Sequence, residues 1–188
     1  MTVAKEIIKT HKDGENMKQV WWLPQIYWEL SLKDSPLGSQ GIIDEINSIF
    51  KDYSLFILLD IDISAFSGMK KNEISNLEME VNGKTFKPLK SYSDDIKGMI
   101  DVLKPMYSKM LGQMGENIEF YIFDNTGKNA ISPEKESIFN ISFNDFSFEY
   151  NLPLSSLVNE KSCPVDNKKY NGGWKYCPYH GAELVQDN

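Results

Sequence analysis

Residues 53–63, with the sequence YSLFILLDIDI, constrain the fold of this chain more than any other stretch. The stretch is almost continuously apolar at first and then alternates with Asp60 and Asp62. β-branched and aromatic residues in this pattern predict a strand that is buried on both faces and emerges at one end. We therefore expect this segment to be the central strand of the domain.

Further strands are predicted as antiparallel hairpins around it. Residues 76–88 alternate apolar and acidic side chains, and Asn82-Gly83 favours a two-residue hairpin turn within them. A strand is expected at 118–123, and the alternating segments 138–143 and 146–152 form a hairpin through Asn144-Asp145. Six strands connected in this way favour an antiparallel β sandwich or barrel over a parallel sheet.

Three helices accompany these strands. Pro24 suits the first position of a short helix over 24–33, which ends in turn residues at 34–38. Apolar residues at helical spacing predict a second helix over 42–50 and a longer one over 96–114, kinked or broken at Pro105. The predicted class is α+β, rich in β structure, with N-terminal helices and a helical insertion.

The chain divides into three parts. Residues 1–19 have only weak periodicity and are interpreted as a polar, frayed or partly helical arm. Residues 20–158 form the α+β core domain, and the segment 152–157 is the expected hinge to an appendage of residues 159–188. Such an appendage is too small to bury a core by itself.

Composition excludes several classes of function. The chain has 188 residues, of which 41% are hydrophobic, so it can fill one core. A net charge of −7 and a pI near 4.9 argue against a nucleic-acid partner. No apolar run is long enough for a transmembrane segment, and no secretory signal is visible. The expected location is cytoplasmic by default, although an exported mature form is also compatible with the sequence.

The C-terminal appendage contains two pairs of potential metal ligands. Cys163 and Asp166 are separated by two residues, as are Cys177 and His180, and a proline follows each cysteine. Two such knuckles can bring four ligands into a tetrahedron. The sequence therefore predicts one structural Zn held by Cys163, Asp166, Cys177 and His180, with no open position for catalysis.

The segment 174–184, WKYCPYHGAEL, resembles the second half of a zinc ribbon, a family with the pattern Cys-Pro-x-Cys-Gly in each knuckle. This chain has Asp166 and His180 in place of two cysteines, and Asn167 in place of the first glycine. Carboxylate and imidazole are legitimate zinc ligands, but the set binds zinc more weakly than four thiolates. Two alternatives stay open: a metal-free tail held by aromatic packing, and a Cys163–Cys177 disulfide.

Other candidate groups have simpler explanations. Asp60 and Asp62 share one face of their strand and could serve a metal-dependent hydrolase, or they could mark a strand end that reaches solvent. His11 is expected to be solvated in the arm. The methionines at 99, 106, 110 and 114 are expected to pack in the core rather than form a binding face, and the aromatic residues around Trp21 to pack rather than stack on a ligand.

The order of strands, the Asn-Gly hairpin and the Phe-rich final hairpin resemble immunoglobulin-like domains of small exported bacterial proteins. That resemblance implies an interaction or adhesion module with an unidentified protein or small-molecule partner. The sequence shows no nucleophile elbow, phosphate-binding glycine loop or metalloprotease helix. We therefore expect a non-enzymatic binding or structural module, with a metal-dependent hydrolase using Asp60 and Asp62 as the alternative.

Overall fold

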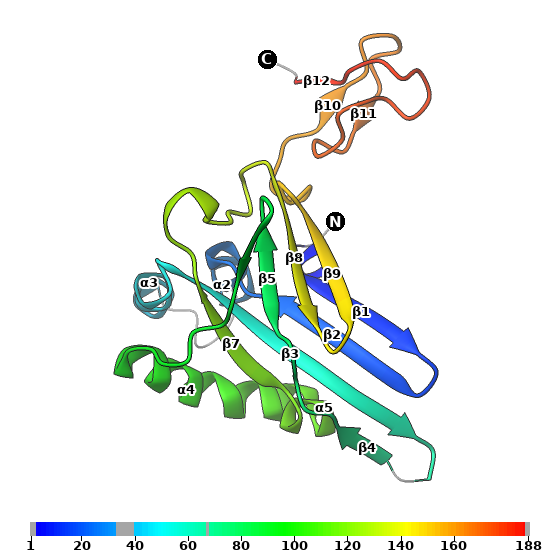
Figure 1. Cartoon of the computed structure of the whole chain (residues 1–188). Helices are drawn as coiled ribbons and strands as arrows, with labels where there is room; N and C mark the ends of the chain where they lie inside the picture. The colour runs from blue at the N-terminus through cyan, green and yellow to red at the C-terminus, as the bar shows by residue number, and fades with distance from the viewer. Residues whose placement is uncertain (1–2, 33–39, 67, 187–188) are drawn as a thin grey trace.

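The computed structural model describes residues 3–32, 40–66 and 68–186, and the turn predicted at 34–38 lies outside these residues. The protein is α+β and rich in antiparallel strands (Figure 1). Its helices are α1 (Ala4–Ile7), α2 (Gln25–Leu32), α3 (Gln40–Ile49), α4 (Asp94–Leu111) and α5 (Gln113–Glu116). A short 3-10 helix covers Gly127–Asn129.

The larger sheet is built around the predicted central strand. It contains β1 (Ile8–Asp13), β2 (Asn16–Trp22), β3 (Tyr53–Ser64), β4 (Gly68–Lys71) and β7 (Glu119–Asp124). Strand β2 pairs with one edge of β3, while β7 and β4 pair with successive parts of its other edge. All these pairings are antiparallel, so the prediction of a central strand over 53–63 is confirmed.

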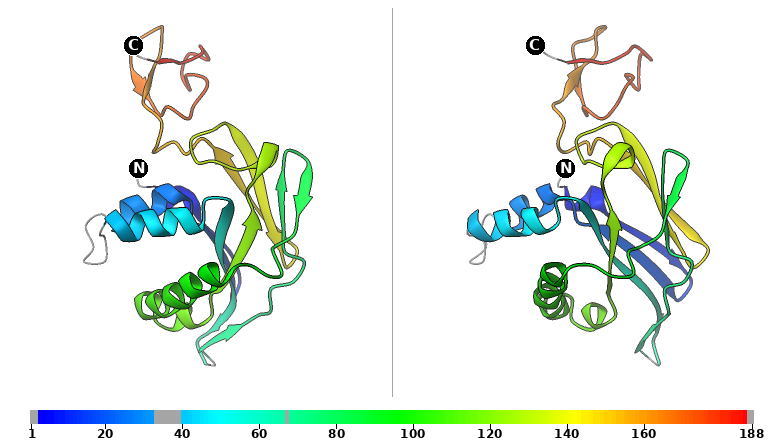
Figure 2. Two further views of the ribbon diagram at one scale, coloured as in Figure 1. Left: turned by 90° about the vertical axis from the view of Figure 1, so that its left-hand side faces the viewer. Right: turned by 60° about the vertical axis from the view of Figure 1, so that its left-hand side comes forward.

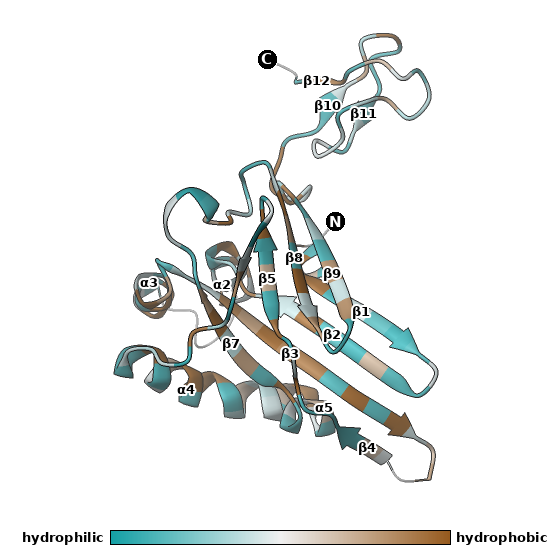
Figure 3. Cartoon of the chain, in the orientation of Figure 1, coloured by the Kyte–Doolittle hydropathy of each residue, from teal (hydrophilic) through white to brown (hydrophobic). Residues whose placement is uncertain are grey.

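Strand β3 is buried on both faces because two different layers cover it. Leu55, Ile57, Leu59 and Ile61 pack against helices α2, α3 and α4. Phe56 and Leu58 point to the opposite side and pack against the second sheet. Figure 2 shows the helices on one side of the larger sheet and the second sheet on the other, and Figure 3 shows the hydrophobic character of β3.

The second sheet has the order β6-β5-β8-β9. Its strands are β5 (Glu78–Val81), β6 (Lys84–Phe86), β8 (Ser137–Phe143) and β9 (Phe146–Leu152). Both predicted hairpins are confirmed, with positive φ at Asn82 and Gly83 in one turn and at Asn144 and Asp145 in the other. The two sheets face each other across a shared apolar core in which Trp22, Phe139 and Tyr150 contact one another.

The predicted helices are confirmed with one change. Helix α4 runs through Pro105 without a break and ends at Gly112, where a φ of 59° stops the helical path. The pyrrolidine ring is accommodated on an exposed part of the helix. None of the helices in the described ranges is long and apolar enough to cross a membrane.

Within the predicted frayed or partly helical arm of residues 1–19, the described residues 3–19 include the short helix α1, but most of them form strands. Strand β1 and most of β2 lie in this range, and they extend the larger sheet because β1 pairs with β2 and β2 pairs with β3, both antiparallel. The pattern of the segment is polar because β1 is an edge strand with largely exposed side chains. Backbone hydrogen bonds to the neighbouring strands stabilise this segment, although its side-chain pattern does not predict a strand.

The C-terminal tail, residues 159–186, stands above the two sheets (Figure 1). It contains three two-residue strands, β10 (Lys161–Ser162), β11 (Lys169–Tyr170) and β12 (Val185–Gln186), in the order β11-β10-β12. A single bridge joins Tyr176 to Glu183. Its small core consists of Cys163, Cys177 and Leu184, with Tyr170 packed against them.

Candidate functional site

The two cysteines of the tail lie in loops with matching backbone hydrogen bonds. In the first loop, Asn167 N–H donates to the Cys163 carbonyl at 2.8 Å, and Cys163 N–H donates to the Lys168 carbonyl at 2.9 Å. In the second loop, Gly181 N–H donates to the Cys177 carbonyl at 2.9 Å, and Cys177 N–H donates to the Ala182 carbonyl at 2.8 Å. Two independent stretches of sequence therefore adopt one knuckle geometry.

The knuckle geometry explains why asparagine can replace glycine in the first loop. Asn167 has a φ of 56° and Gly181 has a φ of 63°, so both occupy the left-handed region. Asparagine is among the non-glycine residues that adopt this region most readily. The departure from the zinc-ribbon pattern at Asn167 is therefore compatible with a complete turn.

His180 lies between the two thiols. Its Nδ1 atom is 3.4 Å from the Cys163 sulfur and 3.5 Å from the Cys177 sulfur. With usual zinc bond lengths, tetrahedral coordination places a thiolate sulfur and an imidazole nitrogen about 3.6 Å apart. All three ligand atoms lie within 4.8 Å of one another, close enough to hold a metal ion.

The environment of the thiols favours one thiolate. Burial by itself raises the pKa of Cys177, but the N–H groups of Tyr179 and His180, with the Cys163 and His180 side chains, lower it to about 7. Burial raises the pKa of Cys163 as well, and there the neighbouring Cys177 thiol adds to the rise. Because the thiolate is the form that binds metals, the loop N–H groups prepare Cys177 for coordination.

Asp166 occupies a different position from the other three predicted ligands. It is not among the residues whose ligand atoms lie within 4.8 Å of one another. Its carboxylate accepts a hydrogen bond from Lys168 N–H at 3.2 Å and lies 3.6 Å from the Lys168 ammonium group. Burial raises its pKa, but Lys168, Cys163 and His180 together lower it below its usual value, so the group is ionised beside Cys163.

Aromatic packing also contributes to the tail, as the metal-free alternative requires. The Tyr170 ring lies 6.2 Å from Trp174 and 6.3 Å from Tyr179, measured between ring centroids. Cys163 and Cys177 are both buried and are not joined by a disulfide in this structure. The distances of 3.4 and 3.5 Å from His180 Nδ1 to the two sulfurs are nevertheless close to those of a tetrahedral zinc site, and aromatic packing does not by itself explain them.

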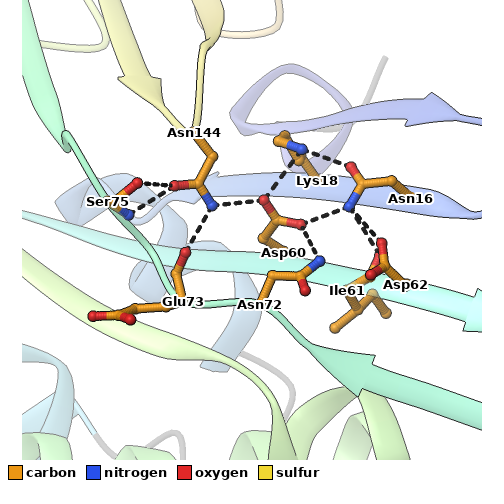
Figure 4. A network of polar contacts seen from close by, with 9 residues as sticks. All are labelled: Asn16, Lys18, Asp60, Ile61, Asp62, Asn72, Glu73, Ser75 and Asn144. Carbon is orange, nitrogen blue, oxygen red and sulfur yellow. Dashed lines mark hydrogen bonds and ion pairs between the residues drawn. The ribbon is translucent and has the colours of Figure 1, made fainter.

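A second polar cluster surrounds Asp60, which lies on the face of β3 that looks toward the second sheet (Figure 4). Its carboxylate accepts hydrogen bonds from three side-chain amides, at 2.8 Å from Asn16, 3.1 Å from Asn72 and 2.8 Å from Asn144. The Lys18 ammonium group is 3.2 Å away. These four donors come from three separate parts of the chain and meet only in the folded protein.

The prediction that Asp60 reaches solvent at a strand end is wrong, because only 2% of the residue is exposed. Burial raises its pKa, but the amides of Asn144, Asn16 and Asn72, together with Lys18, lower it below its usual value. Asp62 shares its face of the strand, as predicted, and Asn16 donates to both carboxylates. Because four donors surround the ionised carboxylate, we interpret the cluster as a structural one that joins β3 to the segments that carry the donors.

The remaining candidate residues pack in the protein. His11 is not simply solvated, since its ring stacks on Phe146 with centroids 3.7 Å apart. Trp22 and Trp28 are almost fully buried, as expected of core residues. Three of the four methionines on α4 and α5 pack against the helix-side core, whereas Met110 is exposed.

The sequence does not single out the donors around Asp60, which are Asn16, Lys18, Asn72 and Asn144. The sequence indicates only a turn at Asn144, and Asn16 and Lys18 belong to the segment interpreted as an arm. No local pattern connects residues that are 12 to 84 positions away from Asp60.

Comparison with known proteins provides little further information. No family model and no curated protein matches the chain. The crystal structure of a DUF4426 family protein from Pseudomonas aeruginosa is similar over 78% of this chain and 94% of that one, at 9% sequence identity. The TM-score of 0.32 is too low for this likeness to support any inference about fold or function.

Proposed function

We propose that this protein is a non-enzymatic binding or structural module whose tail, residues 159–188, holds one structural zinc ion through Cys163, Asp166, Cys177 and His180. The observation that supports the proposal best is the position of His180 Nδ1, at 3.4 and 3.5 Å from the two sulfurs. The first knuckle supplies Cys163 and the second supplies Cys177 and His180, and the spacing of these three atoms fits tetrahedral coordination.

The same proposal assigns the metal a role in folding. The tail buries few large side chains, and its strands are only two residues long. Segments of this size need a metal, a disulfide or another cross-link to be stable. With four protein ligands the ion has no open position, so it would contribute folding free energy rather than catalysis.

The test is the zinc content of protein purified without a histidine tag. We expect about one equivalent of zinc in the wild type and a large loss in Cys177→Ser and His180→Asn. His11→Asn is the matched control, because it removes the other histidine of the chain and should keep the zinc. A wild-type content below about 0.2 equivalents that Cys177→Ser does not change would contradict the proposal.

The role of Asp166 needs its own variant. Asp166→Asn should weaken zinc binding at least about tenfold, because the neutral amide is a poor zinc ligand. Competition with a chromogenic chelator measures this change. An unchanged affinity would mean that a group other than Asp166 is the fourth ligand. The assignments of the other three ligands would not change.

The alternative of a metal-dependent hydrolase using Asp60 and Asp62 finds less support. A carboxylate that acts as base or ligand needs an accessible oxygen atom. The donors around Asp60 occupy its oxygens instead, and the residue is almost fully buried. These contacts favour the non-enzymatic role.

The immunoglobulin-like arrangement of the sheets is also a proposal. It is supported by the apolar core that the two antiparallel sheets share. An experimental structure would test it through the strand order and the angle between the sheets.

A further inference from the structure

Strand β9 is a long open edge of the second sheet. It has seven residues and pairs only with β8, in a register without a bulge. Figure 1 shows it on the outer side of that sheet, and in the described part of the chain no other strand pairs with its outer edge. The opposite edge strand, β6, has only three residues. A long edge strand without proline or a bulge can pair with another chain.

The register decides which backbone groups of β9 are available. Phe143 and Phe146 flank a two-residue turn and therefore exchange both of their backbone hydrogen bonds. Because bonded pairs alternate along an antiparallel ladder, the N–H and C=O groups of Ser147, Glu149 and Asn151 point away from β8. These three residues are exposed, and no backbone group of the described residues bonds to them from the outer side.

A pocket of about 330 Å³ opens at the end of this edge, where β9 meets the hinge. Tyr150 and Asn151 of β9 line it, together with Lys5, Lys9 and the tail residue Trp174. The Lys9 ammonium group lies 4.9 Å from the centre of the Tyr150 ring. Within the described ranges, neither lysine makes an ion pair.

The charge around this pocket is positive. Its one carboxylate, Glu6, accepts hydrogen bonds from the N–H groups of Ser155 and Ser156. A third ammonium group stands next to the pocket, because Lys161 donates to the Trp174 carbonyl at 3.2 Å. Three lysines against one hydrogen-bonded carboxylate favour a negative group in the pocket.

We propose that β9 pairs with an extended, antiparallel segment of a partner protein, and that the segment carries a carboxylate on the residue opposite Tyr150. In this mode of recognition, backbone hydrogen bonds supply affinity and pockets for alternate side chains supply specificity. Directly opposite residues of an antiparallel pair point to the same face, so the carboxylate lies on the Tyr150 side of the edge, beside Lys9.

A second copy of this chain fits the edge less well. Antiparallel pairing of two β9 strands over their whole length places the two Glu149 side chains opposite each other, and like charges in that position are destabilising. The inference rests on the proposed binding role and names its partner class. It does not depend on the zinc site, since no predicted zinc ligand lies on β9 or lines the pocket.

The test uses the peptide acetyl-Thr-Thr-Glu-Lys-Val-Thr-Thr-amide, whose glutamate is placed opposite Tyr150 and whose lysine is placed opposite Glu149. NMR titration of the full chain should give saturable shifts of the Ser147, Glu149 and Asn151 amides, with a dissociation constant of about 0.1 mM. Glutamine in place of the peptide glutamate should weaken binding about fivefold. N-methylation of the peptide lysine removes the donor to the Glu149 carbonyl and should weaken binding at least about tenfold.

The variant Lys9→Gln tests the assignment of the pocket. Its preference for the glutamate peptide over the glutamine peptide should fall from about fivefold to less than about twofold. Wild-type affinity for the glutamine peptide shows that this variant is folded. Lys12→Gln is the matched control, because Lys12 is exposed on β1 outside the pocket, and this variant should keep the full preference.

Four outcomes overturn the proposal. Three concern the peptides: no saturable binding, equal binding of the N-methylated and parent peptides, or a preference for glutamate that Lys9→Gln leaves unchanged. The fourth is a shift of the same edge amides with protein concentration alone, which would assign the edge to a second copy of the chain. The zinc content of the same samples tests the metal site separately.

Discussion

At the scale of single residues, Asp60 shows how a charged group can be stable between two sheets. A buried carboxylate loses hydration, and this loss is costly unless charges and donors compensate for it. Asn16, Asn72 and Asn144 supply hydrogen bonds, and Lys18 supplies a positive charge with only 14% of its side chain exposed. Removing the charge of Asp60 would leave these groups without their common partner.

We expect Asp60→Asn to lower the free energy of unfolding by about 2–4 kcal/mol. The substitution keeps the shape of the side chain but turns one acceptor into a donor that faces other donors, and it removes the negative charge that Asp60 places beside Lys18. Urea unfolding of the variant and the wild type measures the difference. Asp62→Asn, in the more exposed neighbour, should stay within about 0.5 kcal/mol of the wild type.

The same residue should contribute to the pH dependence of stability. The folded-state pKa of Asp60 is lowered, so its contribution is present above the unfolded-state pKa of about 3.9 and is lost as the pH falls through the folded-state value. Urea midpoints between pH 6 and 3 should therefore fall less steeply in Asp60→Asn than in the wild type. Parallel curves for the two proteins would contradict this assignment.

At the scale of elements, the turn between β8 and β9 does more than reverse the chain. Asn144, with a φ of 47°, takes a backbone conformation that glycine adopts more easily. Its side chain accepts hydrogen bonds from Ser75 N–H and Oγ at 2.7 Å and donates to Asp60 and to the Glu73 carbonyl at 2.8 Å. The turn therefore joins the second sheet to β3 and to the segment before β5.

Asn144→Gly separates these two roles, because glycine keeps the turn geometry and removes the side chain. We expect a loss of about 2–3 kcal/mol in the free energy of unfolding, since Asp60 and Ser75 lose hydrogen bonds in a partly buried place. Chemical denaturation measures the loss. Asn82→Gly is the matched control, because Asn82 has a φ of 51° in the other hairpin turn, and this variant should change stability by less than about 0.5 kcal/mol.

At the scale of the whole molecule, the first residue of the tail makes a close backbone contact with a later part of the tail. A Cβ atom on Gly172 would lie 1.8 Å from the Asn159 carbonyl oxygen, so only glycine fits there. Glu6, next to β1, accepts hydrogen bonds from the N–H groups of Ser155 and Ser156 at 2.7 and 2.9 Å. The Glu6 hydrogen bonds hold the hinge on the core, and the Gly172 contact packs the later part of the tail against its first residue.

Gly172→Ala should release this contact without altering the two sheets. We expect faster proteolytic cleavage near residues 155–160 by at least about threefold, because local opening of the hinge exposes its backbone. Limited proteolysis followed by mass spectrometry measures the rate. Gly173→Ala is the control, because its Cβ would lie 3.1 Å from the Ser155 Cβ and needs only a small adjustment. Equal cleavage rates in the wild type and both variants would contradict the role of Gly172.

Residue patterns alone predicted much of the fold. The central strand, both hairpins in the second sheet and the three main helices follow from side-chain periods and turn residues, which act over a few positions. The two knuckles follow from the spacing of Cys163, Cys177 and His180, and the structure brings these three together. Local sequence determines such features because the interactions that form them are local.

Only the tertiary structure decided the place of the N-terminal strands and the surroundings of Asp60. Strand β2 is fixed by pairing with β3, some 40 residues away, so its polar half carries no strand signal of its own. The donors to Asp60 likewise come from distant segments. Sequence periodicity indicates which face of an element is apolar, but it does not indicate which other elements will pack against that face. Packing between distant segments depends on interactions throughout the whole fold.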